Sequence, residues 1–371
     1  MRIFHILEFN QFNTGSVHQM FQAAAGLRER GHDVTVISRP DAILQRRCEE
    51  QGIAFVGLAL KNQLDIASIR ALARLVRHKN PDVIHVHKGV AHALALAATW
   101  WNPAGAFIVN RGVSFPLNLL NRAKFRTRRV DRIVTVCDEI RQVVITSGKL
   151  PPEKVVVIYA GTDVAEFDPA KWDPRAFRVE KQISEDTFLI GQVGVRDWKG
   201  WKYLVDAVAI MPKVHLALIG CRNEAEADEV TEYAESRGIR DRVHAVEYRT
   251  DMPKVLSACD LVVDASWAGT GITGTIREAM AMQKPVIATN CGGNAELVSS
   301  PDVGWLVPPR DVRTLASAIR EVIEQPERAA KVARNARAHV VRGFSKELRI
   351  SKLAELYATV LGGRSAGRSK G

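Results

Sequence analysis

Residues 264–296, DASWAGTGITGTIREAMAMQKPVIATNCGGNAE, contain the pattern that decides the fold. An apolar strand expected at 261–265 leads into a turn with three glycines, and the following helix carries Glu278. A second strand is expected at 285–289. A glycine-rich turn between a strand and a helix presents free backbone N–H groups and the positive end of the helix dipole. The stretch therefore predicts a phosphate site in an α/β fold.

The same alternation of apolar strands and amphipathic helices runs along the chain. Strands are expected at 2–9, 33–38, 55–60, 83–86, 106–109, 132–136 and 155–158, and then at 188–193, 215–219, 243–246, 261–265 and 285–289. Strands separated by helices predict parallel sheets with right-handed crossovers. We expect two doubly wound domains, 1–165 and 186–345, with a linker at 163–185. Ligands of such sheets bind beyond the carboxyl ends of the strands, so the site is expected in a cleft where the domains face each other.

Composition restricts the class of protein. The chain has 371 residues, 46% hydrophobic and 25% charged, as in soluble globular proteins. No apolar run approaches the roughly 18 residues that span a bilayer, and the N-terminus enters a strand directly, so we expect a cytoplasmic protein without a signal peptide. The five cysteines have no metal-ligand spacing and are expected to be free thiols. The net charge of +11 favours an anionic partner. The tail 362–371 is expected to be disordered.

Two loops of the second half carry candidate phosphate ligands. Gly271, Ile272 and Thr273 can offer N–H groups to a diphosphate, and Glu278 can accept hydrogen bonds from a ribose diol. An alternative is that Glu278 only completes a capping box with Thr275. After the strand at 188–193, the stretch GVRDWKG (194–200) brings Arg196 and Lys199 together. These cations can neutralise a leaving diphosphate, or belong to an ordinary solvated turn.

Two features of the first half are candidates for ligand binding. Gly15 lies in the turn between the first strand and the first helix, which lacks the Gly-x-Gly-x-x-Gly pattern and so argues against a nicotinamide enzyme. An ordinary capped turn fits equally well. His85 and His87 end the fourth strand on one face. His87 is a candidate for a direct catalytic role, a structural role being the alternative, and no metal site is expected because no third ligand is evident.

A basic stretch interleaved with apolar residues follows at 115–129. This pattern suits the headgroup layer of an anionic membrane, whereas a solvated basic loop is the alternative. Nucleic acid is not expected as a partner, because no recognition motif accompanies the patch. The candidate contacts with membrane or acceptor in and near this stretch are Phe115, Leu119, Arg122, Lys124, Phe125 and Arg126.

Several short motifs, taken in order, resemble glycosyltransferase family 4, whose members are retaining nucleotide-sugar transferases of GT-B fold. They are RGHDVTV (30–36), PDVIHVH (81–87), VDRIVTV (130–136), WKG (198–200), EAMA (278–281) and GGNAE (292–296). The resemblance implies two Rossmann-like domains, with the donor site on the second and the acceptor site on the first. It also implies no required metal or cofactor, and a C-terminal helix at about 346–361 that returns to the first domain.

The resemblance also implies roles for individual residues. Arg196 and Lys199 would stabilise the departing diphosphate, Glu278 would hold the donor ribose, and Gly15 would lie near the phosphates or the transferred sugar. The chain departs from the family at Thr270, where a glutamate usually contacts the transferred sugar. It departs again where Asn110 and Arg111 replace a histidine, so that Arg111 is a candidate for meeting an anionic acceptor or sugar, and at residues 160–161, where Ala-Gly replaces Asn-Gly.

The resemblance predicts a glycosyltransferase that moves a sugar from a nucleotide-diphosphate sugar to a saccharide or lipid-linked acceptor with retention. UDP-sugar is the favoured donor and GDP-sugar the alternative. The cellular role expected is cell-envelope polysaccharide or lipopolysaccharide synthesis at the inner face of the cytoplasmic membrane. A nucleotide-sugar epimerase of the same fold, and a non-catalytic homologue that has lost activity at Thr270, are the alternatives.

Overall fold

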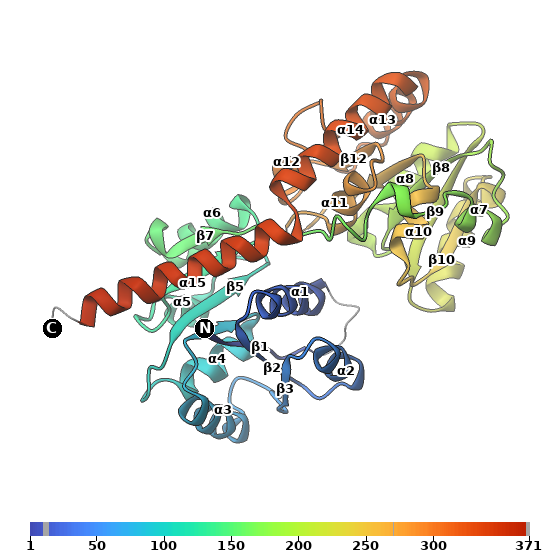
Figure 1. Cartoon of the computed structure of the whole chain (residues 1–371). Coiled ribbons are helices and arrows are strands. Elements are labelled where there is room, and N and C mark those ends of the chain that lie inside the picture. Colours follow the sequence, from blue (N-terminus) through green and yellow to red (C-terminus); the bar gives the residue numbers. More distant parts are fainter. Residues whose placement is uncertain (10–14, 270, 369–371) are drawn as a thin grey trace. The chain divides into compact units, whose positions relative to one another are not determined.

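The computed structural model of the chain describes residues 1–9, 15–269 and 271–368 (Figure 1). The chain forms two compact units, the first made of Met1–Gly161 with Lys346–Gly371 and the second of Thr162–Ser345. Each unit contains one sheet in which every strand pair is parallel. This agrees with the α/β architecture that the alternation of strands and helices predicts.

The first unit has a seven-stranded sheet in the order β3-β2-β1-β4-β5-β6-β7. Its strands are β1 (Arg2–Leu7), β2 (Asp33–Ser38), β3 (Ala54–Gly57), β4 (Val83–Val86), β5 (Ala106–Arg111), β6 (Arg132–Thr135) and β7 (Val155–Val157). Its helices are α1 (Gly15–Glu29), α2 (Ala42–Glu50), α3 (Ile66–Lys79), α4 (Gly89–Ala98), α5 (Leu119–Arg126), α6 (Asp138–Gly148), the short η1 (Pro152–Lys154) and α15 (Lys346–Arg368). The chain order reverses between β1 and β4, which is where doubly wound sheets bind ligands.

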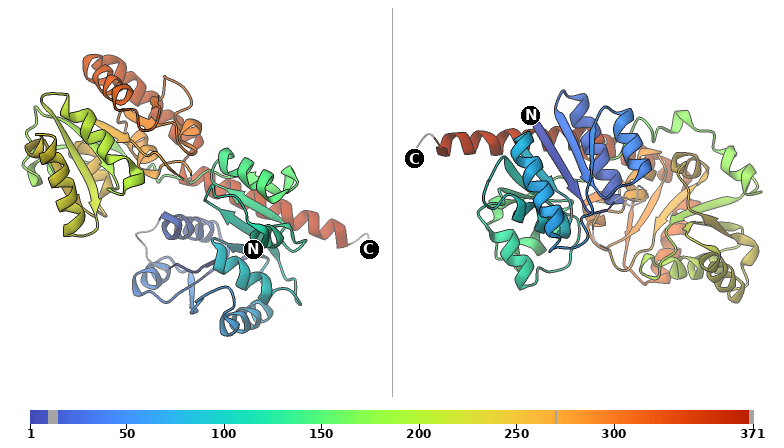
Figure 2. Two further views of the ribbon diagram at one scale, coloured as in Figure 1. Left: turned by 180° about the vertical axis from the view of Figure 1, so that it is seen from behind. Right: turned by 90° about the horizontal axis from the view of Figure 1, so that it is seen from below.

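The C-terminal helix α15 is part of the core of the first unit. It is coloured red in Figure 1 and runs along the first unit in each view of Figure 2. Its residues Ile350, Leu353 and Tyr357 are buried in one hydrophobic cluster with α1. Gly26 of α1 allows this close approach, because a Cβ there would collide with the side chain of Ile350. Burial of this apolar face therefore joins the last helix to the first.

The second unit has a six-stranded sheet in the order β10-β9-β8-β11-β12-β13. Its strands are β8 (Phe188–Val193), β9 (Val214–Cys221), β10 (Val243–Glu247), β11 (Leu261–Asp264), β12 (Val286–Thr289) and β13 (Trp305–Val307). Its helices are α7 (Arg175–Glu180), α8 (Trp201–Ala209), α9 (Glu224–Ser236), α10 (Met252–Ala258), α11 (Gly274–Ala281), α12 (Asn294–Leu297), α13 (Val312–Glu324) and α14 (Pro326–Gly343), with short turns η2 (Pro169–Lys171), η3 (Asp197–Lys199) and η4 (Arg240–Arg242). Here the order reverses between β8 and β11.

The structure corrects the expected linker at 163–185. This segment lies within the second unit, and the first unit ends at Gly161 rather than 165. Arg178 of α7 explains the difference, because its buried guanidinium donates to the Ala258 carbonyl at 3.0 Å and pairs with the carboxylate of Asp260 at 2.7 Å. These bonds attach the segment to the end of α10 and the start of β11.

The disorder expected for the tail is corrected for residues 362–368, since α15 continues to Arg368 instead of ending near 361. Residues 369–371 lie outside the described residues. Arg364 explains the extension: its Nε lies 2.9 Å from Oδ1 of Asp131, and its guanidinium also donates to the Gly105 carbonyl. The polar composition of 362–368 concealed these partners. Among the described residues, no helix combines the length and apolar character needed to cross a bilayer.

Candidate functional site

The strongest candidate site lies at the reversal of strand order in the second sheet. β8 leads into η3, which carries Lys199, and the neighbouring strand β11 ends at Asp264. Both loops follow carboxyl ends of parallel strands, so they emerge at the same edge of the sheet.

Asp264 is buried, and its carboxylate accepts hydrogen bonds from four side chains at this edge of the sheet. Its Oδ1 accepts hydrogen bonds from Nζ of Lys199 at 3.3 Å and the hydroxyl of Ser266 at 2.7 Å. Its Oδ2 accepts from the hydroxyl of Thr273 at 2.8 Å and Nδ2 of Asn294 at 3.0 Å. Burial disfavours ionisation of Asp264, but the Lys199 ammonium and these hydrogen bonds outweigh it and hold the carboxyl pKa below its ordinary value. The charged carboxylate thus fixes four side chains at once.

The backbone around Lys199 is fixed by close contacts. Gly200 has a left-handed φ of 68°, and a Cβ there would collide with the carbonyl of Ala265, so the turn requires glycine. The side chain of Gln192 joins both loops, since its Nε2 donates to the Lys199 carbonyl at 3.1 Å and its Oε1 accepts from the Ala265 N–H at 3.2 Å. The Lys199 side chain keeps 18% of its surface exposed. Its ammonium is therefore held in place and still accessible to a ligand.

Arg196 lies at the start of the same turn and is exposed. Within the described part of the chain its guanidinium has no hydrogen bond or ion pair, and its charge contributes to lowering the pKa of Glu226, after the larger effect of the hydrogen bonds from Arg222. The two predicted cations therefore differ: Lys199 is anchored, whereas Arg196 is unengaged and available to an anion.

The glycine-rich turn differs from expectation at Thr273. Its N–H donates to Oδ1 of Asn294 at 3.0 Å, so it is not free for a phosphate, and its hydroxyl is held by Asp264. Gly271 and Ile272 are half-buried and keep the expected place before α11. Thr270 lies outside the described residues.

Glu278 is not a cap partner. α11 begins at Gly274 after the N-cap Thr273, it has no acidic residue in its first turn, and the Thr275–Glu278 capping box is absent. Burial raises the pKa of the Glu278 carboxyl, opposed by the charge of Arg277 and reinforced by Glu166. Glu278 makes no hydrogen bond through its side chain to any residue that the structure describes, so its carboxyl is available to accept from a ligand hydroxyl.

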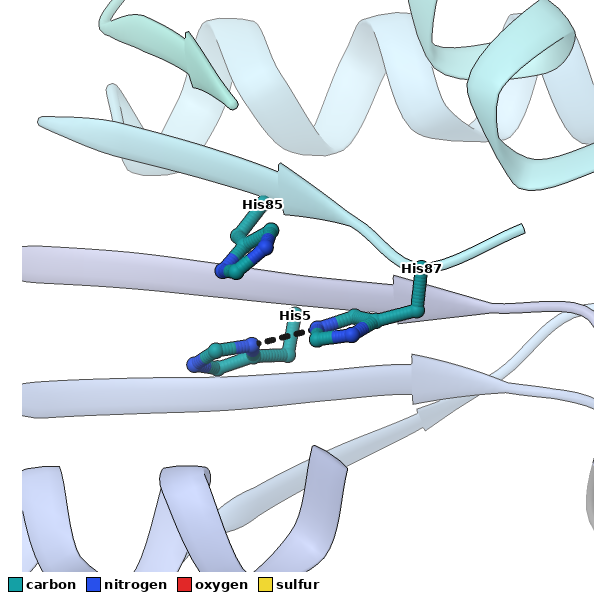
Figure 3. A group of neighbouring side chains, drawn as sticks. All are labelled: His5, His85 and His87. Atoms are coloured by element: carbon teal, nitrogen blue, oxygen red, sulfur yellow. Dashed lines mark hydrogen bonds between the residues drawn. The ribbon is translucent and has the colours of Figure 1, made fainter. Parts of the chain in front are cut away.

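In the first unit, His87 is buried and its Nε2 lies 2.8 Å from Nδ1 of His5 (Figure 3). His85 lies beside them on the same face, as alternation predicts. A third imidazole, which was not evident from the sequence, is that of His5 of β1, and it completes a group of three. Gly15 begins α1, and an added Cβ there would have nothing within 4 Å.

The basic and apolar stretch is only partly exposed. Phe115 and Leu119 expose 66% and 77% of their surface, but Phe125 is 95% buried, and its ring centre lies 4.9 Å from that of His92. Phe125 is therefore a core residue, and its assignment to a membrane or acceptor contact is wrong. The cations have protein partners as well: Arg122 donates to the Ser147 carbonyl at 2.9 Å, Lys124 to Gln63 at 3.1 Å, and Arg111 to the Phe115 carbonyl at 2.7 Å. Arg126 is exposed.

Two residues of the candidate site were missed from the sequence, Asp264 and Asn294. Asp264 lies near the end of the strand expected at 261–265, and Asn294 directly follows a glycine pair, both within the stretch that decides the fold. That position was a usable signal for Asp264, since a charged residue closing an apolar strand at the ligand edge needs a partner.

Comparison with known proteins gives consistent matches. Residues 14–166 match the model of Glycosyltransferase Family 4, and residues 173–339 match that of Glycosyl transferases group 1. The lipopolysaccharide core biosynthesis glycosyltransferase LpsE of Rhizobium meliloti is 27% identical over 90% of this chain and 92% of its own. The UDP-Gal:alpha-D-GlcNAc-diphosphoundecaprenol alpha-1,3-galactosyltransferase of Escherichia coli is 24% identical over 79% of each chain.

Solved structures share the fold. A glycosyltransferase from Rickettsia africae superposes with a TM-score of 0.88 at 20% identity, covering 97% of this chain and 98% of its own. Anabaena HepE in complex with UDP and glucose gives 0.82 at 25% identity, covering 96% and 99%. Together with the two doubly wound sheets, these matches define a glycosyltransferase of GT-B fold. The chain belongs to glycosyltransferase family 4, as the motifs of its sequence indicated.

Proposed function

We propose that this protein transfers a sugar from a UDP-sugar to a saccharide or lipid-linked acceptor, with retention at the anomeric carbon, in the synthesis of cell-envelope polysaccharide or lipopolysaccharide. The names of the relatives in Rhizobium meliloti and Escherichia coli support the role in the envelope. The complexes of HepE with UDP and with UDP-glucose support the donor.

The observation that carries the proposal is the ammonium of Lys199, held by buried Asp264 beside a glycine-rich turn and the N-terminus of α11. Departure of a sugar leaves negative charge on the diphosphate. An ammonium fixed in advance stabilises that charge without reorganisation, and such groups contribute several kcal/mol to catalysis. Arg196 adds a second positive charge with a bidentate fork. The N–H groups of Gly271 and Ile272 supply the donors that Thr273 does not.

The reaction needs no protein nucleophile. The bond from the anomeric carbon to the diphosphate oxygen breaks, and the acceptor oxygen forms its new bond on the same face of the sugar. The acceptor proton passes to the departing diphosphate oxygen. Glu278 binds the ribose hydroxyls of the donor, and its raised pKa is lowered again by the hydrogen bonds it then accepts. No step of this scheme uses His87, which is buried beside His5.

Arg111 is the residue of the first unit that we assign to an anionic acceptor. It lies at the carboxyl end of β5, and its Nε is buried without a hydrogen-bond partner among the described residues. A buried N–H without a partner costs roughly 1–3 kcal/mol, which an acceptor phosphate or sugar oxygen would recover. Exposed Phe115 and Leu119 follow this strand and support contact with the inner face of an anionic membrane.

An assay of nucleotide release tests the proposal. Thermal shifts with UDP and GDP first identify the base, because the bound nucleotide raises apparent stability. UDP release from a UDP-sugar that depends on added lipid-linked saccharide, with a product of retained configuration, is the expected result. Conversion of the sugar without acceptor would instead identify an epimerase, and UDP binding without turnover a non-catalytic homologue.

A further inference from the structure

Three histidines gather on one face of the first sheet, at its reversal of strand order (Figure 3). His5 of β1 is the register partner of His85 of β4. His87 follows β4, and its backbone N–H donates to the Ile6 carbonyl at 3.0 Å. Adjacent parallel strands and the two-residue period of a strand therefore place all three imidazoles together.

The hydrogen bonds of this group are incomplete. His5 and His85 are fully buried and His87 is 5% exposed. Nδ1 of His5 bonds Nε2 of His87 at 2.8 Å, and Nδ1 of His85 bonds the hydroxyl of Tyr357 at 2.6 Å. Within the described residues, Nε2 of His5 and Nε2 of His85 have no partner. Each unsatisfied buried group costs roughly 1–3 kcal/mol, so two in one cluster indicate an absent binding partner.

The chemistry of the group favours a metal ion. One nitrogen from each histidine can be chosen so that all three lie within 4.8 Å of one another. Imidazole nitrogen is the commonest metal ligand among protein side chains, and it suits zinc and other transition metals.

Tyr357 bonds the ring nitrogen of His85 that would face away from a bound ion. Histidine ligands of metals usually bond a second group through their other ring nitrogen, which fixes the ring. The hydroxyl of Tyr357 does this at Nδ1 of His85 and leaves Nε2 for a ligand. Tyr357 belongs to α15, so an ion bound here would join β1 and β4 to the C-terminal helix.

We propose that His5, His85 and His87 bind one transition-metal ion, for which Zn²⁺ is the ion of choice, in a structural site of the first unit. Zinc bonds to imidazole nitrogen at about 2.0–2.1 Å. Bonds to Nε2 of His5 and to Nε2 of His85 would satisfy the two nitrogens that lack a partner. The positive charge of Arg349 and the lack of a carboxylate ligand make this a weaker site than those of zinc-dependent folds. The site is independent of the proposed sugar transfer.

The experiment uses the full chain without an affinity tag, treated with a chelator and then dialysed against Zn²⁺ or Mg²⁺ at pH 7.5. The expected result is one Zn²⁺ per chain, a higher midpoint of thermal unfolding with Zn²⁺ than with Mg²⁺, and visible absorption bands when Co²⁺ replaces zinc. A protein that takes up no Zn²⁺ and shows no shift would overturn the proposal and leave a buried water as the partner of the two nitrogens.

Matched variants locate the ion. His85→Asn is expected to abolish uptake, whereas His244→Asn is expected to retain it. His244 is the control because its Nε2 lies 3.1 Å from Nδ1 of His215 in a stacked pair of the second unit. Tyr357→Phe keeps the three ligands and is expected to weaken Zn²⁺ binding 10- to 100-fold, which tests the site even if His85→Asn fails to fold. Zinc lost from His244→Asn, or unchanged affinity in Tyr357→Phe, would refute the assignment.

Discussion

The carboxylate of Asp264, at the end of β11, lies 3.3 Å from the ammonium of Lys199, in the turn that follows the neighbouring strand β8. Asp264 exposes 3% of its side chain and Lys199 exposes 18%. The buried carboxylate of Asp264 holds the more accessible ammonium of Lys199 at the edge of the sheet where ligands of this fold bind. We infer that Asp264 positions the ammonium of Lys199 for contact with the diphosphate of the donor.

Asp264→Asn is therefore expected to lower the free energy of unfolding by about 3 kcal/mol at pH 7, because it leaves a largely buried ammonium without its countercharge. The native pKa of Asp264 lies below its ordinary 3.8, so this stabilisation is complete above about pH 4 and is lost only as the pH falls through the native pKa. Urea unfolding at pH 7, 5 and 3.5 measures it. Asp197→Asn in the same turn, where the side chain is exposed, should change stability by less than about 0.5 kcal/mol. Equal stability of Asp264→Asn and the parent at pH 7 would contradict the buried pair.

Lys199→Met is expected to lower kcat by about 10²- to 10³-fold, the usual loss when a preorganised group that stabilises transition-state charge is removed. Circular dichroism should remain that of the parent. Lys202→Met is the control, since its exposed Nζ pairs with Glu229 at 2.7 Å instead of with Asp264. Near-normal turnover of Lys199→Met would remove this lysine from the mechanism.

Local patterns predicted much of the fold. The strands at 33–38 and 188–193 have the expected bounds, because each is a short segment rich in Val, Ile, Leu and Phe between helix and turn signals. The three-residue strand β13 was missed, since Trp305–Val307 is too short to show a period. The end of α15 was misjudged because Arg364 finds its partners Asp131 and Gly105 far away in sequence.

Part of the candidate site could also be predicted from the sequence, and part could not. The cations Arg196 and Lys199 could be recognised in one short turn that follows a strand. The bonds of Asp264 to Lys199 could not, because they require that β8 and β11 be neighbours, and strand order is not written in any local pattern. The same holds for His5, which reaches His85 only through the pairing of β1 with β4. Burial of Phe125 likewise depends on His92, a residue of another helix.

Replacing Phe115 and Leu119 with Ser is expected to reduce binding to vesicles that contain phosphatidylglycerol, because both side chains are exposed beside cations. Cosedimentation measures binding. Trp101→Ser is the control: Trp101 is 92% exposed but precedes the amino end of β5, whereas Phe115 follows its carboxyl end. Phe125→Ser should instead destabilise the fold by about 3 kcal/mol. Unchanged cosedimentation of the double variant would reject the membrane contact.

The buried histidines predict loss of stability in mild acid. Burial lowers the pKa of His5 and His92 from 6.5 to about 3, with smaller effects from Arg349 on His5 and from Lys124 on His92. Their stabilisation is complete above pH 6.5, where the unfolded chain is also neutral, and falls as the pH drops from 6.5 toward 3. Each contributes a slope of about 1.4 kcal/mol per pH unit in that window. Urea unfolding of chelator-treated protein between pH 7.5 and 5 measures this slope. His92→Asn removes one titrating group and should reduce the slope by about 1.4 kcal/mol per pH unit. A stability that stays level over this range would show that these groups titrate normally.

Arg364 tests whether the end of α15 belongs to the fold. Its ion pair with Asp131 has side-chain exposures of 28% and 15%, and its second bond reaches the Gly105 carbonyl. Arg364→Ala is expected to lower the free energy of unfolding by about 1 kcal/mol, because a partly buried Asp131 loses a partner. Arg46→Ala, which breaks an ion pair with Glu50 at exposures of 73% and 58%, should have a smaller effect. Equal urea midpoints for Arg364→Ala and the parent would mean that the last turns of α15 contribute nothing, as a disordered tail would.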